Sequence, residues 1–358
     1  MSTFAVTVRK LSKVWSHPNA DRLELAQVND CDYQFVIPKG QYKEGDEVVY
    51  FPVDSILPQD VIAKMGLTGK LAGKDKNRLK TVKLRDQISQ GLVTRPTDFL
   101  WPTKGDSPWK MMSPEEITTA LGVTKYDPPP IPCMTGNLVR MPADIPVYDI
   151  EGAENYPAIV AALMDVQVYI SEKLEGMNSW FSVEGEAVTF GQRHNRIEPI
   201  EDKEHDFLRV SKPEGLFDLG KKLSAKFGGK KVTLRGEYVG PGVQKNIYKL
   251  AENRVYLFDL LVSQGPGDIR YLNPDEFLFE VGTGPLPYVV PPISLGKTLR
   301  EWLNGRTIRE ASNGMSLLLP TQRREGIVIK PMVEGRNGEI GRLLIKQRSP
   351  EYLAESEF

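Results

Sequence analysis

A lysine with acidic neighbours and a glycine three residues later stands in the segment SEKLEGMN, residues 171–178. It follows an apolar run, Asp165–Ile170, whose period-two alternation predicts a β-strand. A lysine at the end of a buried strand, just before a tight turn, is well placed to act as a nucleophile. Ordinary surface hairpins show the same short pattern, so the role of Lys173 depends on the rest of the chain.

Five further segments place charged residues at the ends or in the interior of predicted strands. In chain order they are Gln192-Arg193, Arg235-Gly236-Glu237, Phe258-Asp259, Glu325 to Lys330, and Lys346 with Arg348. The last two side chains occupy alternate positions and therefore share one face of a strand. Each segment alone has an ordinary explanation, such as an outward-pointing glutamate or a charged edge that discourages aggregation. Their ordered combination is improbable by chance and favours Lys173 as a nucleophile.

The ordered series resembles the motifs of the covalent nucleotidyltransferases, the superfamily of polynucleotide ligases and mRNA capping enzymes. The segment from Glu172 to Asn178 is most similar to the RNA ligase form, and the resemblance extends over residues 145–350. The final motif usually reads K-x-K, and here Arg348 replaces the second lysine. Arginine keeps the positive charge and adds a planar fork for phosphate, so we expect catalysis to survive with altered geometry.

The resemblance implies an ATP-dependent RNA ligase that joins RNA 3′-OH and 5′-phosphate ends, with RNA repair as its function. The reaction would pass through a covalent lysyl-AMP and an adenylylated RNA, with ATP as the AMP donor and Mg²⁺ or Mn²⁺ as the metal. An unperturbed lysine has a pKa of about 10.4, so only about one side chain in 2,500 is neutral at pH 7. We therefore expect a divalent metal and nearby cations to favour the neutral amine.

The same resemblance implies a role for each motif residue. The expected catalytic residues are the nucleophile Lys173, with Lys346 and Arg348 neutralising the charge that grows on the α-phosphate. The expected nucleotide contacts are Glu172, Asn178, Arg193, Glu237, Phe258 and Lys330. Among them, Glu237 would meet a ribose hydroxyl and Phe258 would stack on adenine. The expected metal ligands are Glu175 and Glu325, since hard cations prefer oxygen.

The elements that must position these residues fall into three regions of the 358-residue chain. Residues 1–100 show short alternating runs separated by turn signals, which predict an OB-like β-barrel. Residues 101–145 are expected to form a connector, with a helix from Ser113 to Gly122 and a proline-rich stretch at residues 127–132. Residues 146–358 are expected to form an antiparallel-sheet nucleotidyltransferase domain, an ATP-grasp-like ligase domain. The predicted fold class is therefore α+β.

Within the third region, alternating runs predict strands, and two segments favour helices. The expected strands are 166–170, 180–183, 188–190, 232–238, 255–262, 326–329 and 343–345, and the expected helices are 206–208 and 298–303. The segment from His17 to Leu25, in the first region, resembles the opening of tRNA-binding OB modules. Such barrels also serve as spacers, so RNA binding by this domain stays open at this point.

Composition excludes several classes of function. The formal net charge is −1, so nucleic acid would have to meet a local basic face. Candidate phosphate contacts, equally well explained as solvated surface side chains, are Lys10, Lys13, Arg22, Lys39 and Lys43. The 2 cysteines and 3 histidines lack metal-ligand spacing, which argues against a zinc site or a disulfide framework. With no long apolar run, we expect a soluble, cytoplasmic or nuclear protein, with no membrane and no protein partner implied.

Three rival interpretations stay open. The first is a DNA ligase or an mRNA capping guanylyltransferase, but those enzymes carry an OB domain after the last motif. Here only 10 residues follow Arg348 and the barrel-like region comes first, as in a small group of ATP-dependent RNA ligases. The second is a non-catalytic RNA-binding protein that kept the fold. The third is a Schiff-base lysine of the pyridoxal type, in which the paired terminal cations would have no task.

Overall fold

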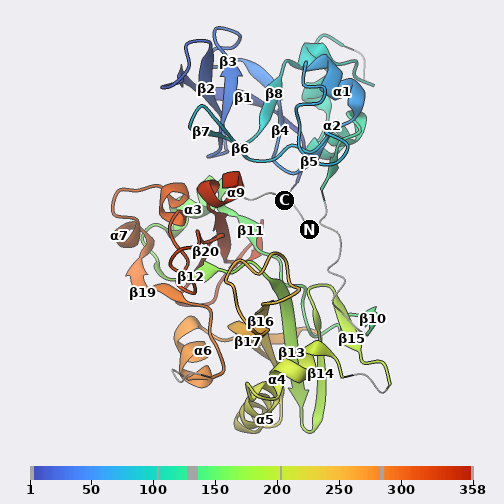
Figure 1. Cartoon of the computed structure of the whole chain (residues 1–358), viewed down its shortest axis with the longest axis vertical. Helices are drawn as coiled ribbons and strands as arrows, with labels where there is room; N and C mark the ends of the chain where they lie inside the picture. The colour runs from blue at the N-terminus through green and yellow to red at the C-terminus, as the bar shows by residue number, and fades with distance from the viewer. Residues whose placement is uncertain (1–3, 103–104, 127–135, 202–203, 283–285, 356–358) are drawn as a thin grey trace. The chain divides into compact units, whose positions relative to one another are not determined.

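The computed structural model describes residues 4–102, 105–126, 136–201, 204–282 and 286–355 (Figure 1). The chain divides into two compact units, one made of residues 1–129, 152–160 and 350–358, the other of residues 130–151 and 161–349. The proline-rich stretch at residues 127–132 lies outside the described residues. Among the described helices, none is long and apolar enough to span a membrane.

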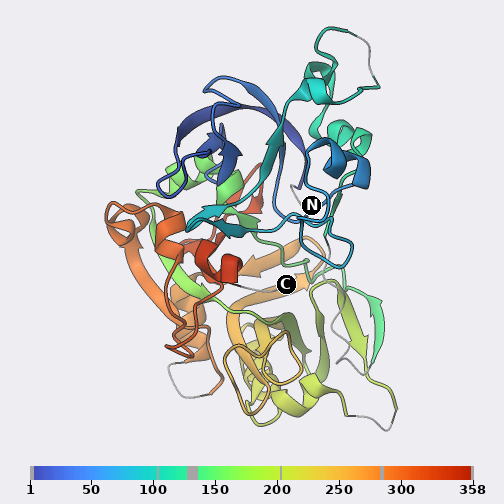
Figure 2. The same cartoon turned by 45° about the horizontal axis from the view of Figure 1, so that its top comes forward.

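An antiparallel sheet in the order β3-β2-β1-β4-β8 forms the body of the first unit (Figure 2). Its strands are β1 (Thr7–Ser16), β2 (Leu23–Val28), β3 (Gln34–Pro38), β4 (Glu47–Phe51) and β8 (Leu92–Thr94). The 10-residue β1 pairs with β4 through its first half and with β2 through its second half. A register shift between Leu11 and Lys13 marks the change of partner, where a bulge increases the curvature. The predicted OB fold is confirmed.

Shorter elements complete the first unit. They are β5 (Ser55–Ile56), β6 (Val82–Leu84), β7 (Gln87–Ser89), β9 (Thr124–Lys125), α1 (Gln59–Lys64), α2 (Pro114–Ala120), α9 (Pro350–Glu355), and the 3-10 turns Pro96–Asp98, Pro108–Met111 and Ala153–Asn155. The predicted start of α2 is confirmed, because the Ser113 hydroxyl accepts from the Glu116 N–H at 3.2 Å and the Glu116 carboxylate accepts from the Ser113 N–H at 2.7 Å. Helix α1 was not expected, and its two buried residues are adjacent, Val61 and Ile62, which gives no helical period.

Two sheets build the second unit. The larger runs β10-β15-β14-β13-β16-β17-β18 and the smaller β11-β23-β20-β12-β19. The larger sheet consists of β10 (Asn137–Arg140), β13 (Met177–Glu184), β14 (Ala187–Gln192), β15 (Asn195–Glu198), β16 (Lys231–Val239), β17 (Arg254–Gly265) and β18 (Asp268–Tyr271). The smaller consists of β11 (Glu151–Gly152), β12 (Gln167–Lys173), β19 (Pro292–Thr298), β20 (Gly326–Pro331) and β23 (Ile345–Arg348), with the hairpin β21 (Arg336–Asn337) and β22 (Gly341–Arg342) before β23.

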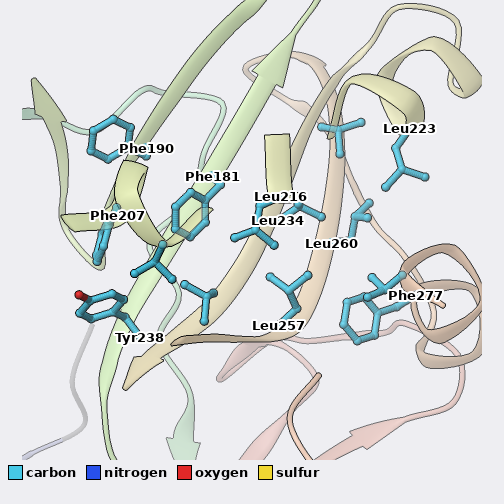
Figure 3. Close-up of a cluster of buried hydrophobic side chains, with 14 of the residues drawn as sticks. Phe181, Phe190, Phe207, Leu216, Leu223, Leu234, Tyr238, Leu257, Leu260 and Phe277 are labelled. Atoms are coloured by element: carbon cyan, nitrogen blue, oxygen red, sulfur yellow. The ribbon is translucent and has the colours of Figure 1, made fainter. Parts of the chain in front are cut away.

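Helices α4 (Asp206–Ser211), α5 (Leu216–Lys226) and α6 (Pro274–Val281) supply the core of the larger sheet, while α7 (Leu299–Leu303) and α8 (Ile308–Ser312) follow β19, and α3 (Pro157–Leu163) precedes β12. Figure 3 shows Phe207 of α4 beside Phe181 of the sheet, Leu216 of α5 beside Leu234, and Phe277 of α6 near Leu257. The α+β class with antiparallel sheets is confirmed.

The last strand differs from its prediction. It begins at Ile345, not at Leu343. The N–H of Leu343 donates to the Gly335 carbonyl at 2.9 Å and that of Leu344 to the Arg342 carbonyl at 2.9 Å. These turn hydrogen bonds use the donors that a ladder would need, so the apolar pair ends the hairpin before the strand starts.

Gly326 lies between β12 and β23, where a side chain has no room. An added Cβ would stand 2.2 Å from the Gln347 carbonyl oxygen and 2.8 Å from the Arg348 Cα, both backbone atoms. We expect Gly326→Ala to force β20 and β23 apart and to lower the free energy of unfolding by about 1–3 kcal/mol. Denaturant unfolding measures the loss. In the control Gly338→Ala the new Cβ meets nothing within 4 Å, so equal stability of the two variants would contradict the prediction.

Glu214 carries a carboxyl group that is only 6% exposed, and its Oε1 accepts from the Val255 N–H at 3.2 Å. Burial raises its pKa from 4.5 to about 7. The unfolded chain ionises this group at lower pH than the folded chain, so folding loses stability as pH rises from about 4.5 to about 7. We expect Glu214→Gln to be neutral at about pH 4 and stabilising at about pH 8, by up to about 3 kcal/mol. Denaturant unfolding at both pH values tests this, and a difference that does not change with pH would refute it.

Candidate active site

The register of three strands places four predicted site cations on one face of the smaller sheet. Lys173 of β12 is paired with Gly326 of β20, which is paired with Arg348 of β23. Lys346 of β23 is paired with Val328 of β20, two residues after Gly326. Lys330 lies two residues after Val328 in the same strand. Because side chains two apart in a strand point to the same side, all four cations leave the same face.

Lys173 ends β12 with its amine in an ion pair. Its Nζ lies 2.6 Å from Oε1 of Glu325, and the two side chains are 24% and 14% exposed. Glu325 directly precedes β20, and its carbonyl oxygen accepts from the Ser349 N–H at 2.8 Å. The predicted nucleophile and one predicted metal ligand are therefore adjacent, although more than a hundred residues separate them in the sequence.

Glu175 brings a second buried carboxylate to this pair. It is 8% exposed, and among the described residues no side chain hydrogen-bonds its carboxylate, whose hydrogen-bonding neighbour is the backbone of Lys245. Burial and the neighbouring charge of Glu325 raise its pKa to about 7, with Lys173 partly offsetting this. Its backbone N–H donates to the Tyr248 hydroxyl at 2.6 Å, which fixes the turn after β12.

These two carboxylates fit a divalent cation. No described side chain hydrogen-bonds the Glu175 carboxylate, and its pKa is raised beside Glu325; a bound cation would relieve both conditions. In the described ranges no group of three or more His, Cys, Asp or Glu side chains is placed to hold a metal. A two-carboxylate site is the type used for Mg²⁺ when substrate phosphates complete the ligands.

Glu237 and Asn178 stand opposite each other on β16 and β13. Burial raises the pKa of Glu237 to about 8, Glu325 adds to the rise, and the charges of Lys173 and Arg193 oppose it. The larger sheet therefore brings Glu237 within electrostatic range of the lysine and its partner acid. The Oδ1 atom of Asn178 has no hydrogen-bond partner in the described part of the chain, so it is available to a ligand.

Arg193 lies on the turn between β14 and β15, half exposed. It forms an ion pair with Asp149, and its Nε donates to the Asp149 carboxylate at 2.6 Å. This pairing holds the guanidinium in place at the edge of the group that includes Glu237.

Phe258 is turned out of the β17 ladder by a bulge. The register between β16 and β17 shifts by one residue, between the Arg235–Asp259 pair and the pair that follows, and Phe258 is the extra residue. Its ring lies 4.9 Å from that of Tyr148, centroid to centroid. Bulges re-aim side chains next to active sites, and this one presents a partly buried aromatic face. Tyr148 was not expected from the sequence, because nothing in its neighbourhood marks it as a site residue.

Lys330 lies in a buried charged cluster with Asp259, Glu334 and Arg342. Its Nζ is 3.0 Å from Oδ1 of Asp259, whose Oδ2 is 2.5 Å from Arg342. Burial lowers the pKa of Lys330, and the two cations hold the pKa of Asp259 at about 2. Arg342 was also missed from the sequence, since its partner Asp259 is distant in the chain. Lys330 shares the sheet face of Lys173 but gives its charge to this cluster.

Glu172 points away from Lys173, as strand alternation requires. It is 1% exposed, and its Oε2 accepts from the Leu317 N–H at 2.7 Å. Its other oxygen, Oε1, has no hydrogen-bond partner among the residues described. The expected residues Lys173, Glu175, Glu237 and Glu325 thus interact electrostatically with one another. Glu172 lies on the face of β12 opposite to that of Lys173.

Comparisons with known proteins agree with this arrangement. Residues 5–96 match an OB-fold domain. Two solved structures, Naegleria gruberi RNA ligase with PPi and a mutant of that ligase with ATP and Mn, superpose with TM-scores of 0.75 at 24% identity. The alignments cover 99% of this chain and 98% and 99% of the respective ligase chains, so the whole fold is shared. No curated protein sequence matches the chain significantly.

The catalytic region gives the family. Residues 166–347, just over half of the chain, match RNA ligase. This span contains the predicted motif residues from Glu172 to Lys346. The chain belongs to the RNA ligase family.

Proposed function

We propose that this RNA ligase uses ATP to join RNA 3′-OH and 5′-phosphate ends through a lysyl-AMP on Lys173. The observation that carries the proposal is the placement of Lys173 beside Glu325, on the sheet face that also bears Lys346 and Arg348. The solved Naegleria ligase with ATP and Mn, of the same fold, supports ATP and a divalent cation as ligands.

In the first step, the Lys173 amine attacks the α-phosphorus of ATP. A nitrogen–phosphorus bond forms, and the bond to pyrophosphate breaks. The amine must lose its proton to water before it attacks. Lys346 and Arg348, on the same face, stabilise the negative charge that grows on the phosphate.

Glu175 and Glu325 would hold the metal. When bound, the divalent cation supplies charge neutralisation at the phosphates and competes with Lys173 for the Glu325 carboxylate. The buried carboxylate of Glu175 is suited to this role because no side chain in the described part of the chain hydrogen-bonds it.

The remaining predicted residues would bind the nucleotide. Phe258, turned out by its bulge, would stack on adenine with Tyr148 supporting its ring. Glu237 would meet the ribose, with Asn178 and Arg193 beside it.

Two further predicted contacts are constrained by their neighbours. Oε2 of Glu172 accepts from the Leu317 N–H, so a nucleotide contact would use the other oxygen, Oε1. Lys330 would act as a fixed charge, because its amine is bound to Asp259.

The second and third steps transfer AMP to an RNA 5′-phosphate and then displace it with a 3′-OH. Neither step needs a protein nucleophile, so both depend on the positioning of strand ends. OB folds bind oligonucleotides, and the first unit would contribute in this way. Its candidate phosphate contacts Lys10, Lys13, Arg22, Lys39 and Lys43 are all exposed.

Loss of the nucleophile tests the proposal directly. With α-labelled ATP and Mg²⁺ or Mn²⁺, we expect the wild-type chain to become covalently labelled at Lys173, and Lys173→Ala to show no label. Denaturing gels and peptide mapping give the readout. Lys297→Ala, on the exposed part of β19, is the control that keeps the label.

Labelling of the wild type by GTP instead of ATP would indicate a capping enzyme, and absence of any label would indicate a non-catalytic protein. The acceptor is tested on a nicked duplex. Joining at a DNA 3′-OH in preference to an RNA 3′-OH would overturn the RNA assignment.

Lys346 separates catalysis from binding. Because its charge is needed most when negative charge grows on the α-phosphate, we expect Lys346→Ala to slow adenylylation about a hundredfold at saturating ATP. The KM for ATP should change far less. Arg348→Lys restores the usual motif and is the matched control, expected to stay active. An equal loss in both parameters for Lys346→Ala would show a binding role only.

A further inference from the structure

The residues just before Lys173 and Glu325 are both anchored to one segment, residues 311–317, which we call the anchor segment. Glu172 accepts from the Leu317 N–H at 2.7 Å, and the Ser316 hydroxyl also hydrogen-bonds its carboxyl group. Both residues of the catalytic ion pair therefore have a neighbour that binds the same short stretch of chain.

Arg324 binds the other end of the anchor segment. Its Nε donates to the Ser312 carbonyl at 2.9 Å, and one terminal nitrogen donates to the carbonyls of Ala311 at 2.8 Å and Asn313 at 2.6 Å. These are carbonyls at the C-terminal end of α8, which lack partners within the helix. A planar guanidinium can satisfy several carbonyls at once, whereas a lysine is a single point donor.

Backbone hydrogen bonds join the anchor segment to residues 322–324. The Arg324 N–H donates to the Gly314 carbonyl at 3.0 Å, and the Ser316 N–H donates to the Gln322 carbonyl at 2.7 Å. Gly314 has a φ of +144°, and a Cβ added there would lie 3.0 Å from the Arg324 guanidinium. The segment is thus tightly fitted around this one side chain.

Charge ties the two anchors to each other. The Arg324 guanidinium lies within electrostatic range of the Glu172 carboxyl group. An acid from β12 and a base just before β20 therefore attract each other beside the anchor segment.

We propose that Arg324 is a positioning residue, which sets the distance between Lys173 and Glu325 by holding the anchor segment against Glu172. The inference rests on the proposed function, because it concerns the formation of lysyl-AMP. Arg324 itself does not touch the reacting atoms, so its loss misplaces the acid with respect to the lysine without removing either.

The test compares Arg324→Met with Arg306→Met. Arg306 donates to the carbonyls of Leu303 at 3.0 Å and Trp302 at 3.2 Å, at the end of α7, and so makes the same kind of cap away from the ion pair. The readouts are the rate of lysyl-AMP formation at saturating α-labelled ATP, the KM for ATP, and the thermal midpoint. We expect Arg324→Met to lower the rate about tenfold to a hundredfold with the KM nearly unchanged.

Arg306→Met should lower the thermal midpoint about as much as Arg324→Met does, but it should keep the wild-type rate of lysyl-AMP formation. Arg324→Lys keeps the charge but not the fork, and we expect an intermediate rate; it also serves if Arg324→Met does not fold. A wild-type rate in a folded Arg324 variant, or an equal loss in Arg306→Met, would overturn the inference. If the wild-type chain itself forms no lysyl-AMP, the proposed function fails and the inference fails with it, which the unlabelled wild-type lane shows separately.

Discussion

The register between β12, β20 and β23 is the constraint on which the site depends. It sets Lys173, Gly326 and Arg348 in one row across three strands, and the ion pair from Lys173 to Glu325 at 2.6 Å becomes possible only in that row. A slip of one residue in the pairing of a strand would turn its cations to the other face of the sheet. The backbone hydrogen bonds between these strands therefore fix the positions of the site side chains. Sites built on strands in this way are better fixed than sites on loops.

Two groups of charge in the second unit differ in how they are balanced. Asp259 has Lys330 and Arg342 as close partners, and its pKa falls to about 2. Glu175 and Glu237 form no such ion pair among the residues that the structure describes, and burial raises their pKa values to about 7 and about 8. The first group neutralises itself and holds strands together. The second group gains charge balance when a cation joins it, which is the property expected of a binding site.

Sequence patterns were sufficient for what lies along a single strand or turn. Alternation alone placed Lys346 and Arg348 on one face, and the capping pattern at Ser113 marked the start of a helix. The same patterns carry no information on side chains brought together from distant positions, such as Tyr148 and Phe258. Short helices such as α1, α6 and α8 were also missed, because fewer than three turns give too few apolar positions to show a period.

Alternation also explains why neighbours within one motif do different work. Glu172 and Lys173 are consecutive, so one side chain reaches the anchor segment and the other reaches Glu325 on the opposite face. Arg324 and Glu325, which precede β20, also have different partners: Arg324 binds the anchor segment and Glu325 binds Lys173. An interpretation that treats every residue of a motif as a ligand contact overlooks this difference between the two side chains. In this fold the effect of a substitution should follow the face on which the side chain lies, and distance along the chain from Lys173 is a poorer guide.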